Sequence, residues 1–399
     1  MKNKVEQQYN KYIYPLPIMD LNEYRKNGNW DLTDPKYLRR KYWPKKIEPD
    51  NLKILIAGCG CNQAAEIAFN NQNCEVIGVD ISESSLNHQI YLKNKHELKN
   101  LKLFKLEIEN INSLKYKFDL IISTGVLHHL ISPDIGIQKL STLLEDHGVL
   151  SIMLYGKYPR TGVYMLQEVF KAIELQQNEN DLELVIKTIA EIPKHHHVNS
   201  YIKYSQDLYY DSGIVDTFMH TQDRSYSVPE ILDFTERNNL QFQSWLDNLD
   251  ISLEANLLKT HPLYQKIKKL PKEEQWKIIE LLTQNQARQF FILSKKIKNI
   301  NEFTLDFNND DKWLNYIPSI RVPTQVLRRC TSISEPNSIL KRNKEFELNF
   351  LEGKIFELCD GKKTINTIKK YLKNEISNHD LNIFFRKMHD LDHLIFEIK

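Results

Sequence analysis

The chain has 399 residues, which favours two domains, and its 41% hydrophobic and 27% charged residues are typical of globular proteins. Its 54 basic and 52 acidic residues nearly cancel, so no overall field would attract nucleic acid or an anionic membrane. The first residues lack the apolar core of a secretory signal, and no apolar stretch approaches the roughly 20 residues that span a bilayer. The five cysteines are odd in number and lie mostly in apolar surroundings, so we expect a reduced, cytoplasmic compartment and no membrane partner.

From residue 53 to 296, short apolar runs alternate with helical periods, which is typical of α/β proteins with a doubly wound, mostly parallel sheet. The first run, KILIAG, is continuous and ends in glycine, as expected for a buried parallel strand. The pattern predicts strands at 53–58, 75–80, 101–108, 118–124 and 147–156, and helices at 63–72, after a cap at Ser82, and at about 135–144.

The regular alternation stops in residues 157–240, where we expect a helical insertion that covers one end of the sheet. Within it, Ser227 and Glu230 form a capping box that opens a helix. The elements predicted here and beyond are helices near 163–176, 182–192 and 229–239, and returning strands at 242–247 and 288–296.

The last hundred residues differ in pattern from the sheet. They contain a short acidic linker, an extended stretch with prolines, three helical segments and a terminal strand, a succession consistent with a small α+β, winged-helix-like domain. We therefore expect an N-terminal segment (1–52), a Rossmann-like domain (53–297) and a C-terminal domain (300–399).

Two glycines and one carboxylate carry the first chemical signal. Gly58 and Gly60 lie in the first strand–helix turn, where small residues let the backbone approach a ligand. Asp80 ends the next strand, 20 residues beyond Gly60, close to the spacing at which nucleotide-binding sheets place an acid on ribose hydroxyls. The alternative interpretation is that the glycines make only a tight turn and that Asp80 caps a helix.

At this point the sequence resembles the class I S-adenosylmethionine-dependent methyltransferases. The matching motifs are ILIAGCGCNQ, VIGVDIS, FDLIISTGVLHHL and LLEDHGVLSIMLY, in that order, over about residues 50–156. The N-terminal V-E-Q-Q-Y…Y-P-L-P also resembles a segment of bacterial members with an AGCG-type loop, where it would lie over the bound cofactor.

The resemblance implies S-adenosylmethionine as cofactor and assigns residues to its parts. Gly58, Cys59 and Gly60 would contact the methionine moiety, and Asp80 would hold the ribose. The remaining contacts would be Ile81, Glu107 and Ile108 at the adenine, and Thr124 and Gly125 beneath the sulfonium.

The loop departs from the family pattern at two positions. Asn62 stands where a third glycine is usual, and asparagine tolerates a positive φ better than most residues, so we expect the turn to survive. Ile56 stands where an acid often binds the methionine amino group, and Gln63 is a candidate substitute.

Transfer of an activated methyl group requires alignment more than covalent catalysis, with a base only where the acceptor keeps its proton. We select His128, Tyr14 and Tyr155 as catalytic candidates, although a packing role for the histidine is the alternative. The wider acceptor-side set is Tyr9, His129, Tyr209, Tyr210, His220 and Arg224. We expect no metal, since Cys59 and Cys61 lack a second ligand pair, His195–His197 are adjacent, and Asp216, His220 and Asp223 form only a weak set.

The predicted function is methyl transfer to a small molecule or a peptide. The fourth-strand exit reads S-T-G-V, which argues against adenine or glutamine amino groups as acceptors. The segment LEGKIFELCDGKKTINTIKKYL weakly resembles PqqD-like winged helices and suggests a protein partner, with simple packing as the alternative. A cofactor-binding scaffold and an RNA methyltransferase are the other hypotheses, although no RNA-binding motif is visible.

Overall fold

The computed structural model describes residues 4–296, 304–308, 311–328, 336–342, 344–373 and 375–398. The predicted boundary between 297 and 300, part of the acidic linker, and Cys330 lie outside these residues. No helix in the described part is both long and apolar enough to cross a membrane.

The chain divides into two compact units. Unit 1 comprises residues 1–34, 49–245 and 280–296, and unit 2 comprises residues 35–48, 246–279 and 297–399. This division differs from the predicted boundaries, because two segments expected next to or inside the sheet domain group with the C-terminal residues instead.

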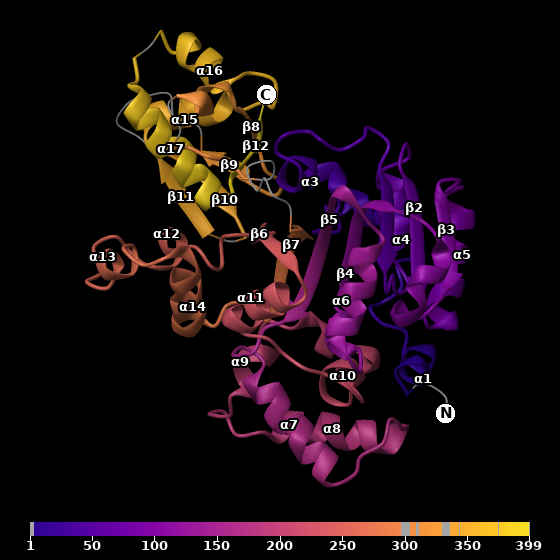
Figure 1. Cartoon of the computed structure of the whole chain (residues 1–399). Helices are drawn as coiled ribbons and strands as arrows, with labels where there is room; N and C mark the ends of the chain where they lie inside the picture. Colours follow the sequence, from indigo (N-terminus) through magenta and orange to yellow (C-terminus); the bar gives the residue numbers. More distant parts are fainter. Residues whose placement is uncertain are drawn as a thin grey trace. The chain divides into compact units, whose positions relative to one another are not determined.

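Unit 1 is built on a seven-stranded sheet of order β3-β2-β1-β4-β5-β7-β6 (Figure 1). Neighbours from β3 to β5 run parallel, whereas β7 is antiparallel to both β5 and β6. The strands are β1 (Lys53–Ala57), β2 (Glu75–Asp80), β3 (Leu101–Lys105), β4 (Phe118–Thr124), β5 (Leu144–Tyr155), β6 (Leu240–Trp245) and β7 (Arg288–Lys295). The predicted Rossmann-like α/β class is confirmed, and the two late segments do return to the sheet.

The central strands are buried on both faces. Ile54, Leu55 and Ile56 of β1 are fully buried, as are Leu120 and Ile121 of the adjacent β4. A continuous apolar run is what a parallel strand covered by helices requires. Parallel strands also place their carboxyl ends at one edge, where ligands bind in open α/β sheets.

The third strand is shorter than predicted. It ends at Lys105, and the 3-10 helix η1 (Ile108–Leu114) follows. Ile108 and Ile111 are buried on η1, so their apolar side chains serve the core without extending the strand.

Three helices connect the parallel strands: α4 (Gln63–Asn70), α5 (Glu83–Lys95) and α6 (Pro133–Thr142). The predicted cap is present, because the Ser82 hydroxyl accepts a hydrogen bond from the Ser85 N–H at 3.1 Å. The short helices α1 (Lys4–Lys11) and α2 (Leu21–Lys26) precede the sheet in unit 1.

The insertion after β5 is helical, as predicted, and has a core of its own. Val163, Phe170, Val185, Val215 and Phe218 pack together in it. Its helices are α7 (Thr161–Ala172), α8 (Glu179–Glu191), α9 (Val198–Ile202) and α10 (Asp211–Phe218), which Figure 1 shows gathered in one group. The chain then enters α11 (Val228–Arg237).

The capping box at the start of α11 is confirmed. The Ser227 hydroxyl accepts from the Glu230 N–H, and the Glu230 carboxylate accepts from the Ser227 N–H at 2.7 Å.

Unit 2 contains the remaining elements. Strands β10 and β11 pair antiparallel, as do β10 with β9 and β12 with β8. The elements are α3 (Pro35–Tyr42), α12 (Leu253–Asn256), α13 (Tyr264–Ile267), the start of α14 (Lys272–Thr283), β8 (Ile317–Ile320), β9 (Gln325–Arg328), β10 (Asn337–Lys341), β11 (Lys344–Leu348), α15 (Phe350–Glu357), α16 (Ile365–Tyr371), α17 (Asn378–Asp390) and β12 (Leu394–Glu397). Within its described residues, the stretch expected to be merely extended therefore forms four strands.

Ion pairs join the start of the 246–279 segment to other residues of unit 2. The fully buried Lys341 ammonium lies 3.3 Å from a carboxylate oxygen of both Asp247 and Asp392. Arg342 also donates to Asp250 at 2.6 Å. A buried ammonium needs such partners, and these are separated from it by too many residues to be read from the sequence.

Candidate functional site

The turn between β1 and α4 requires glycine. Gly58 and Gly60 have φ values of +77° and +53°, which L side chains rarely adopt. A Cβ atom on Gly58 would lie 2.3 Å from Cγ2 of Val126, so no side chain fits there. The N–H groups of Gly58 and Cys59 both donate to the carbonyl of Val79 at 2.9 Å, which joins the turn to β2.

Asp80 is held against this turn at the carboxyl end of β2. Its Oδ2 accepts from the Gly60 N–H and its Oδ1 from the Ser82 N–H, both at 2.8 Å. Burial raises the pKa of the carboxyl, while these two donors oppose the shift. Each oxygen keeps a further lone pair, so the fixed carboxylate can also accept from a diol.

The N-terminal segment lies on the glycine turn. The Asn62 side chain accepts from the Ile18 N–H at 2.9 Å and donates to the Leu16 carbonyl at 2.8 Å. The Cys61 thiol donates to the Pro15 carbonyl at 3.1 Å. The expectation that Asn62 would have to tolerate a positive φ is wrong, because its φ is −129°. Its amide instead binds the N-terminal segment.

Gln63 links this segment to the sheet. Its Nε2 donates to Oδ2 of Asp31 at 2.9 Å and to Oγ1 of Thr124 at 3.1 Å. Asp31 thus brings a carboxylate to the start of α4, whereas Ile56 of β1 replaces the acid that is usual in the family that the sequence resembles. No sequence signal marked Asp31, since it lies in an irregular segment remote from the loop in sequence.

Glu66 of α4, which is also near Asp31, is expected to make the stability of the protein depend on pH. Burial, with the nearby Asp31 and Asp34, raises its pKa to about 8 from 4.5. A raised carboxyl pKa means that ionisation opposes folding, so stability falls as pH rises from about 4.5 through about 8. We expect Glu66→Gln to change stability by less than about 1 kcal/mol at pH 5 and to increase it by about 4 kcal/mol at pH 8.5, measured by urea unfolding. The exposed Glu168→Gln on α7 is the control; equal effects of Glu66→Gln at both pH values would contradict the prediction.

The other predicted cofactor residues lie along the same edge of the sheet. Ile81 directly follows β2, and the exposed Glu107 and buried Ile108 follow β3. Gly125 follows β4 with a φ of +73°, and a Cβ on it would lie 3.3 Å from Cε of Met153. The structure therefore places all of these positions after carboxyl ends of parallel strands.

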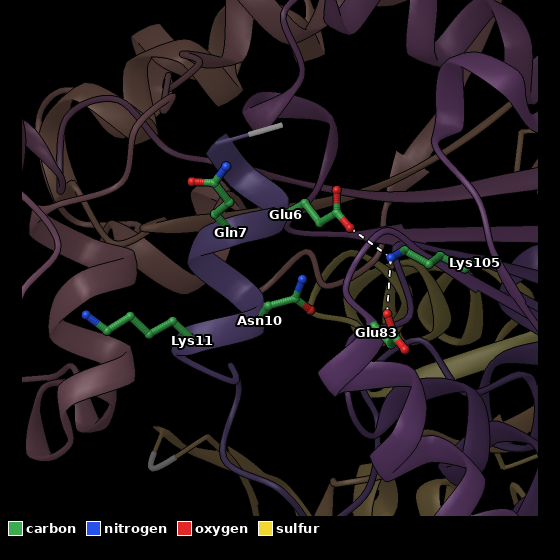
Figure 2. A pocket seen from close by; sticks show the side chains of 6 residues that line it. All are labelled: Glu6, Gln7, Asn10, Lys11, Glu83 and Lys105. Carbon is green, nitrogen blue, oxygen red and sulfur yellow. Dashed lines mark hydrogen bonds and ion pairs between the residues drawn. The ribbon is translucent and has the colours of Figure 1, made fainter. Parts of the chain in front are cut away.

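A surface hollow adjoins this edge, formed by α1, the start of α5 and the end of β3 (Figure 2). Lys105 lies between two carboxylates, 2.8 Å from Glu6 and 3.5 Å from Glu83. Asn10 of α1 accepts from the Ser82 hydroxyl at 3.0 Å. Helix α1 is thus hydrogen-bonded to the residues that follow Asp80.

Several predicted acceptor-side residues form one buried cluster. The His128 ring lies 4.1 Å from the Tyr155 ring, and the His129 ring stacks on that of His220 at 3.8 Å. Tyr9 donates to Asp216 at 2.8 Å and lies 3.3 Å from Nε2 of His220. These residues come from α1, the ends of β4 and β5, and the insertion.

The tyrosines of this cluster are hydrogen-bond donors. Burial and the Asp216 charge raise the pKa of Tyr9, Tyr14 and Tyr155 well above the usual value. Their phenols therefore stay protonated, and Tyr155 donates to Oδ2 of Asp216 at 3.2 Å. Tyr14 also places its carbonyl oxygen 3.6 Å from where a Cβ on Gly60 would lie, which connects the cluster to the glycine turn.

Arg160 is a member of the cluster that the sequence did not indicate. Its guanidinium lies 3.8 Å from the centroid of the Tyr155 ring, donates to the Tyr201 hydroxyl at 2.9 Å, and pairs with Asp223 at 3.2 Å. Both charged side chains are almost fully buried. A lone arginine after a strand carries no local signal, so only the fold could identify it.

Among the described residues, the other candidates form no hydrogen bond or ring contact with the cluster. Tyr209 is 84% exposed, and Arg224 is exposed and donates to the carbonyls of Leu130 and Ile131. Tyr210 precedes α10 without capping it through its side chain. His195 and His197 are exposed, and His196 accepts a hydrogen bond from the Val198 N–H.

The glycine turn, the carboxylate at the tip of β2 and the strand order are together typical of Rossmann-like domains that bind nucleosides. A family model described as "Methyltransferase domain" matches residues 48–223. This part of the chain, less than half of its length, is therefore similar to a methyltransferase domain.

Known proteins that are similar to the chain include one from Synechococcus sp. and one from Rickettsia typhi. An uncharacterised protein from Synechococcus sp. is 24% identical over 253 residues, 61% of this chain and 60% of the relative, so the match spans less than two thirds of that protein. PKMT2 from Rickettsia typhi has the same fold, with a TM-score of 0.65, 14% identity and coverage of 92% of this chain and 75% of that one. PKMT2 is also known in complex with AdoHcy, the demethylated cofactor, with the same TM-score and identity.

Proposed function

We propose that the protein transfers the methyl group of S-adenosylmethionine in line to a small-molecule or peptide acceptor. The observation that carries this proposal is the position of the Asp80 carboxylate, which the Gly60 N–H fixes beside the turn at Gly58, where no side chain fits. Both features suit a nucleoside with a diol and a backbone-contacting tail. When bound, the cofactor supplies a methyl group activated by sulfonium charge.

The proposed cofactor site uses the residues expected from the sequence plus one addition. Asp80 would hold the ribose, Ile81, Glu107 and Ile108 would surround the adenine, and Gly125 would lie beneath the sulfonium. We add Asp31, which through Gln63 is placed to bind the methionine amino group in place of the missing acid at Ile56. The N-terminal segment would then cover the cofactor, as in the AGCG-type proteins that it resembles.

The acceptor would bind in the cluster around Tyr155 and His128, enclosed by the helical insertion. Tyr14 would orient the acceptor as a hydrogen-bond donor, since its phenol stays protonated. The Tyr155 hydroxyl donates to Asp216, so its oxygen would act as an acceptor. Unit 2 would contribute a surface for a protein partner, in line with its resemblance to PqqD-like modules. The likeness to PKMT2 covers 92% of the chain, so that fold extends beyond the sheet unit.

Methyl transfer from labelled cofactor to a lysate, fractionated into small molecules, protein and RNA, tests the proposal. Label in the small-molecule or the peptide and protein fraction would support it. Label in RNA would favour the RNA methyltransferase. Binding of the cofactor without transfer to any fraction would favour the scaffold and overturn the proposal.

A further inference from the structure

Asp216 is a buried carboxylate without a cationic partner in the part of the chain that the structure describes. It is 2% exposed, and its two oxygens accept from the phenols of Tyr9 and Tyr155. The neighbouring Asp223, by contrast, pairs with Arg160. A buried carboxylate that lacks a cation is costly, and a positively charged ligand would relieve that cost.

The backbone of Gln222 sets the tautomers of the two stacked histidines. Its carbonyl lies 2.8 Å from Nδ1 of His129, so that this nitrogen must carry the hydrogen. Its N–H donates to Nδ1 of His220 at 3.0 Å, so that the His220 hydrogen is on Nε2 and faces the oxygen of Tyr9. A neutral imidazole has one donor and one acceptor nitrogen. Nε2 of His129 is therefore a hydrogen-bond acceptor, and Nε2 of His220 is a donor.

His129 consequently presents a free lone pair. Its Nε2 is buried and has no hydrogen-bond partner among the described residues. Its Nδ1 lies 3.6 Å from Oδ1 of Asp223. His128 differs: both of its nitrogens lack partners, and burial holds its pKa well below the usual value.

We propose that Asp216 and His129 form a subsite for a protonated amine, which is the methyl acceptor. The Asp216 carboxylate binds the ammonium group, with Tyr9 and Tyr155 around it, and Nε2 of His129 accepts one proton. This inference rests on the proposed methyl transfer and names the acceptor class. It also makes His129, not the predicted His128, the general base.

The step balances in atoms and charge. One N–H proton of the ammonium passes to Nε2 of His129, and the nitrogen keeps the freed electron pair. That pair forms the N–CH3 bond as the S–CH3 bond breaks and its electrons remain on sulfur. The product is a methylated ammonium and a neutral thioether, and His129 later releases its proton to water.

A metal ion is the competing occupant. Ligand atoms of His129, Asp216 and His220 all lie within 4.8 Å of one another, as do those of His128, His129 and Asp223. However, Nε2 of His220 carries a hydrogen, and His128 has no second partner to orient it. The His129 and His220 rings are also stacked with an interplanar angle of 21°, so their lone-pair directions do not meet at a nearby point. The amine is therefore favoured.

Calorimetry on the full chain saturated with AdoHcy tests the subsite, with n-butylamine and n-butanol as matched probes at pH 7. We expect the amine to bind at least about tenfold more tightly than the alcohol. Asp216→Asn should weaken the amine by at least about tenfold and leave the alcohol unchanged. Binding of both probes equally, or of neither, or an unaffected amine in Asp216→Asn, would overturn the proposal.

Nitrogen-15 NMR of labelled histidines tests the base without relying on activity. We expect the His129 hydrogen on Nδ1 and the His220 hydrogen on Nε2, with assignments from His129→Gln and His220→Gln and the exposed His195→Gln as control. A hydrogen on Nε2 of His129, or tight stoichiometric binding of Zn²⁺ or Mn²⁺, would overturn the proposal. Failure of AdoHcy to bind would instead refute the proposed function, so the two failures are distinguishable.

Discussion

Asp80→Asn is expected to weaken the binding of S-adenosylmethionine and AdoHcy by about 100-fold or more in calorimetry. The carboxylate is fixed by the Gly60 and Ser82 N–H groups, and we propose that it also accepts from both ribose hydroxyls. Hydrogen bonds to a charged group contribute about 1.5–3 kcal/mol each, and an amide keeps only one acceptor oxygen. Loss of the charge should therefore reduce the free energy of cofactor binding more than it reduces the free energy of unfolding.

Asp119→Asn is the matched control for this experiment. Asp119 is also buried and accepts from a strand N–H, that of Lys53 at 2.7 Å, but it lies near the amino end of β4. Because ligands bind at the opposite edge of the sheet, its substitution should leave the cofactor affinity unchanged. An unchanged affinity in Asp80→Asn, or an equal loss in both variants, would show that the ribose assignment is wrong.

Arg160→Met is expected to destabilise the protein by about 3–5 kcal/mol, because it leaves Asp223 buried without its cation. The substitution also removes the hydrogen bond from the guanidinium to Tyr201 and the cation–π contact with the Tyr155 ring. Unfolding in urea, followed by tryptophan fluorescence and by circular dichroism, measures the free energy of unfolding.

Two further variants distinguish the loss of the buried ion pair from the effect of replacing any arginine by methionine. Arg237→Met removes an exposed arginine paired with Asp134 and should cost less than about 1 kcal/mol. Arg160→Met combined with Asp223→Asn should be more stable than Arg160→Met alone, because no unpaired charge is left. A single-variant loss below about 1 kcal/mol, or no recovery in the double variant, would contradict the prediction.

Features that depend on neighbours in the chain were predictable. The strand runs follow from continuous apolar residues, and the caps at Ser82 and Ser227 act over three residues. The glycine turn and Asp80 also belong here, since parallel strands align their carboxyl ends wherever the rest of the chain lies. The early end of β3 was missed because apolar Ile108 suits a strand and a short helix equally.

Features that depend on distant partners were not predictable. Tyr9 and Asp216 are hydrogen-bonded across 207 positions, and Gln63 and Asp31 across 32. Isolated polar residues have no periodicity that would pair them. Asn62 shows the same limit: it was assigned to the turn, and its amide binds the N-terminal segment instead.

By itself, then, the sequence determined the sheet, its order of motifs and the glycine–carboxylate pair that identifies the domain, because these arise from apolar patterning and backbone sterics within short segments. Only the tertiary structure decided which polar side chains meet in the acceptor-side cluster: Arg160 with Asp223, and the phenols of Tyr9 and Tyr155 with Asp216. It also decided that the lone pair on Nε2 of His129 is free. Burial makes each of these polar groups require a partner, and it is the folded chain that determines which partner is within reach.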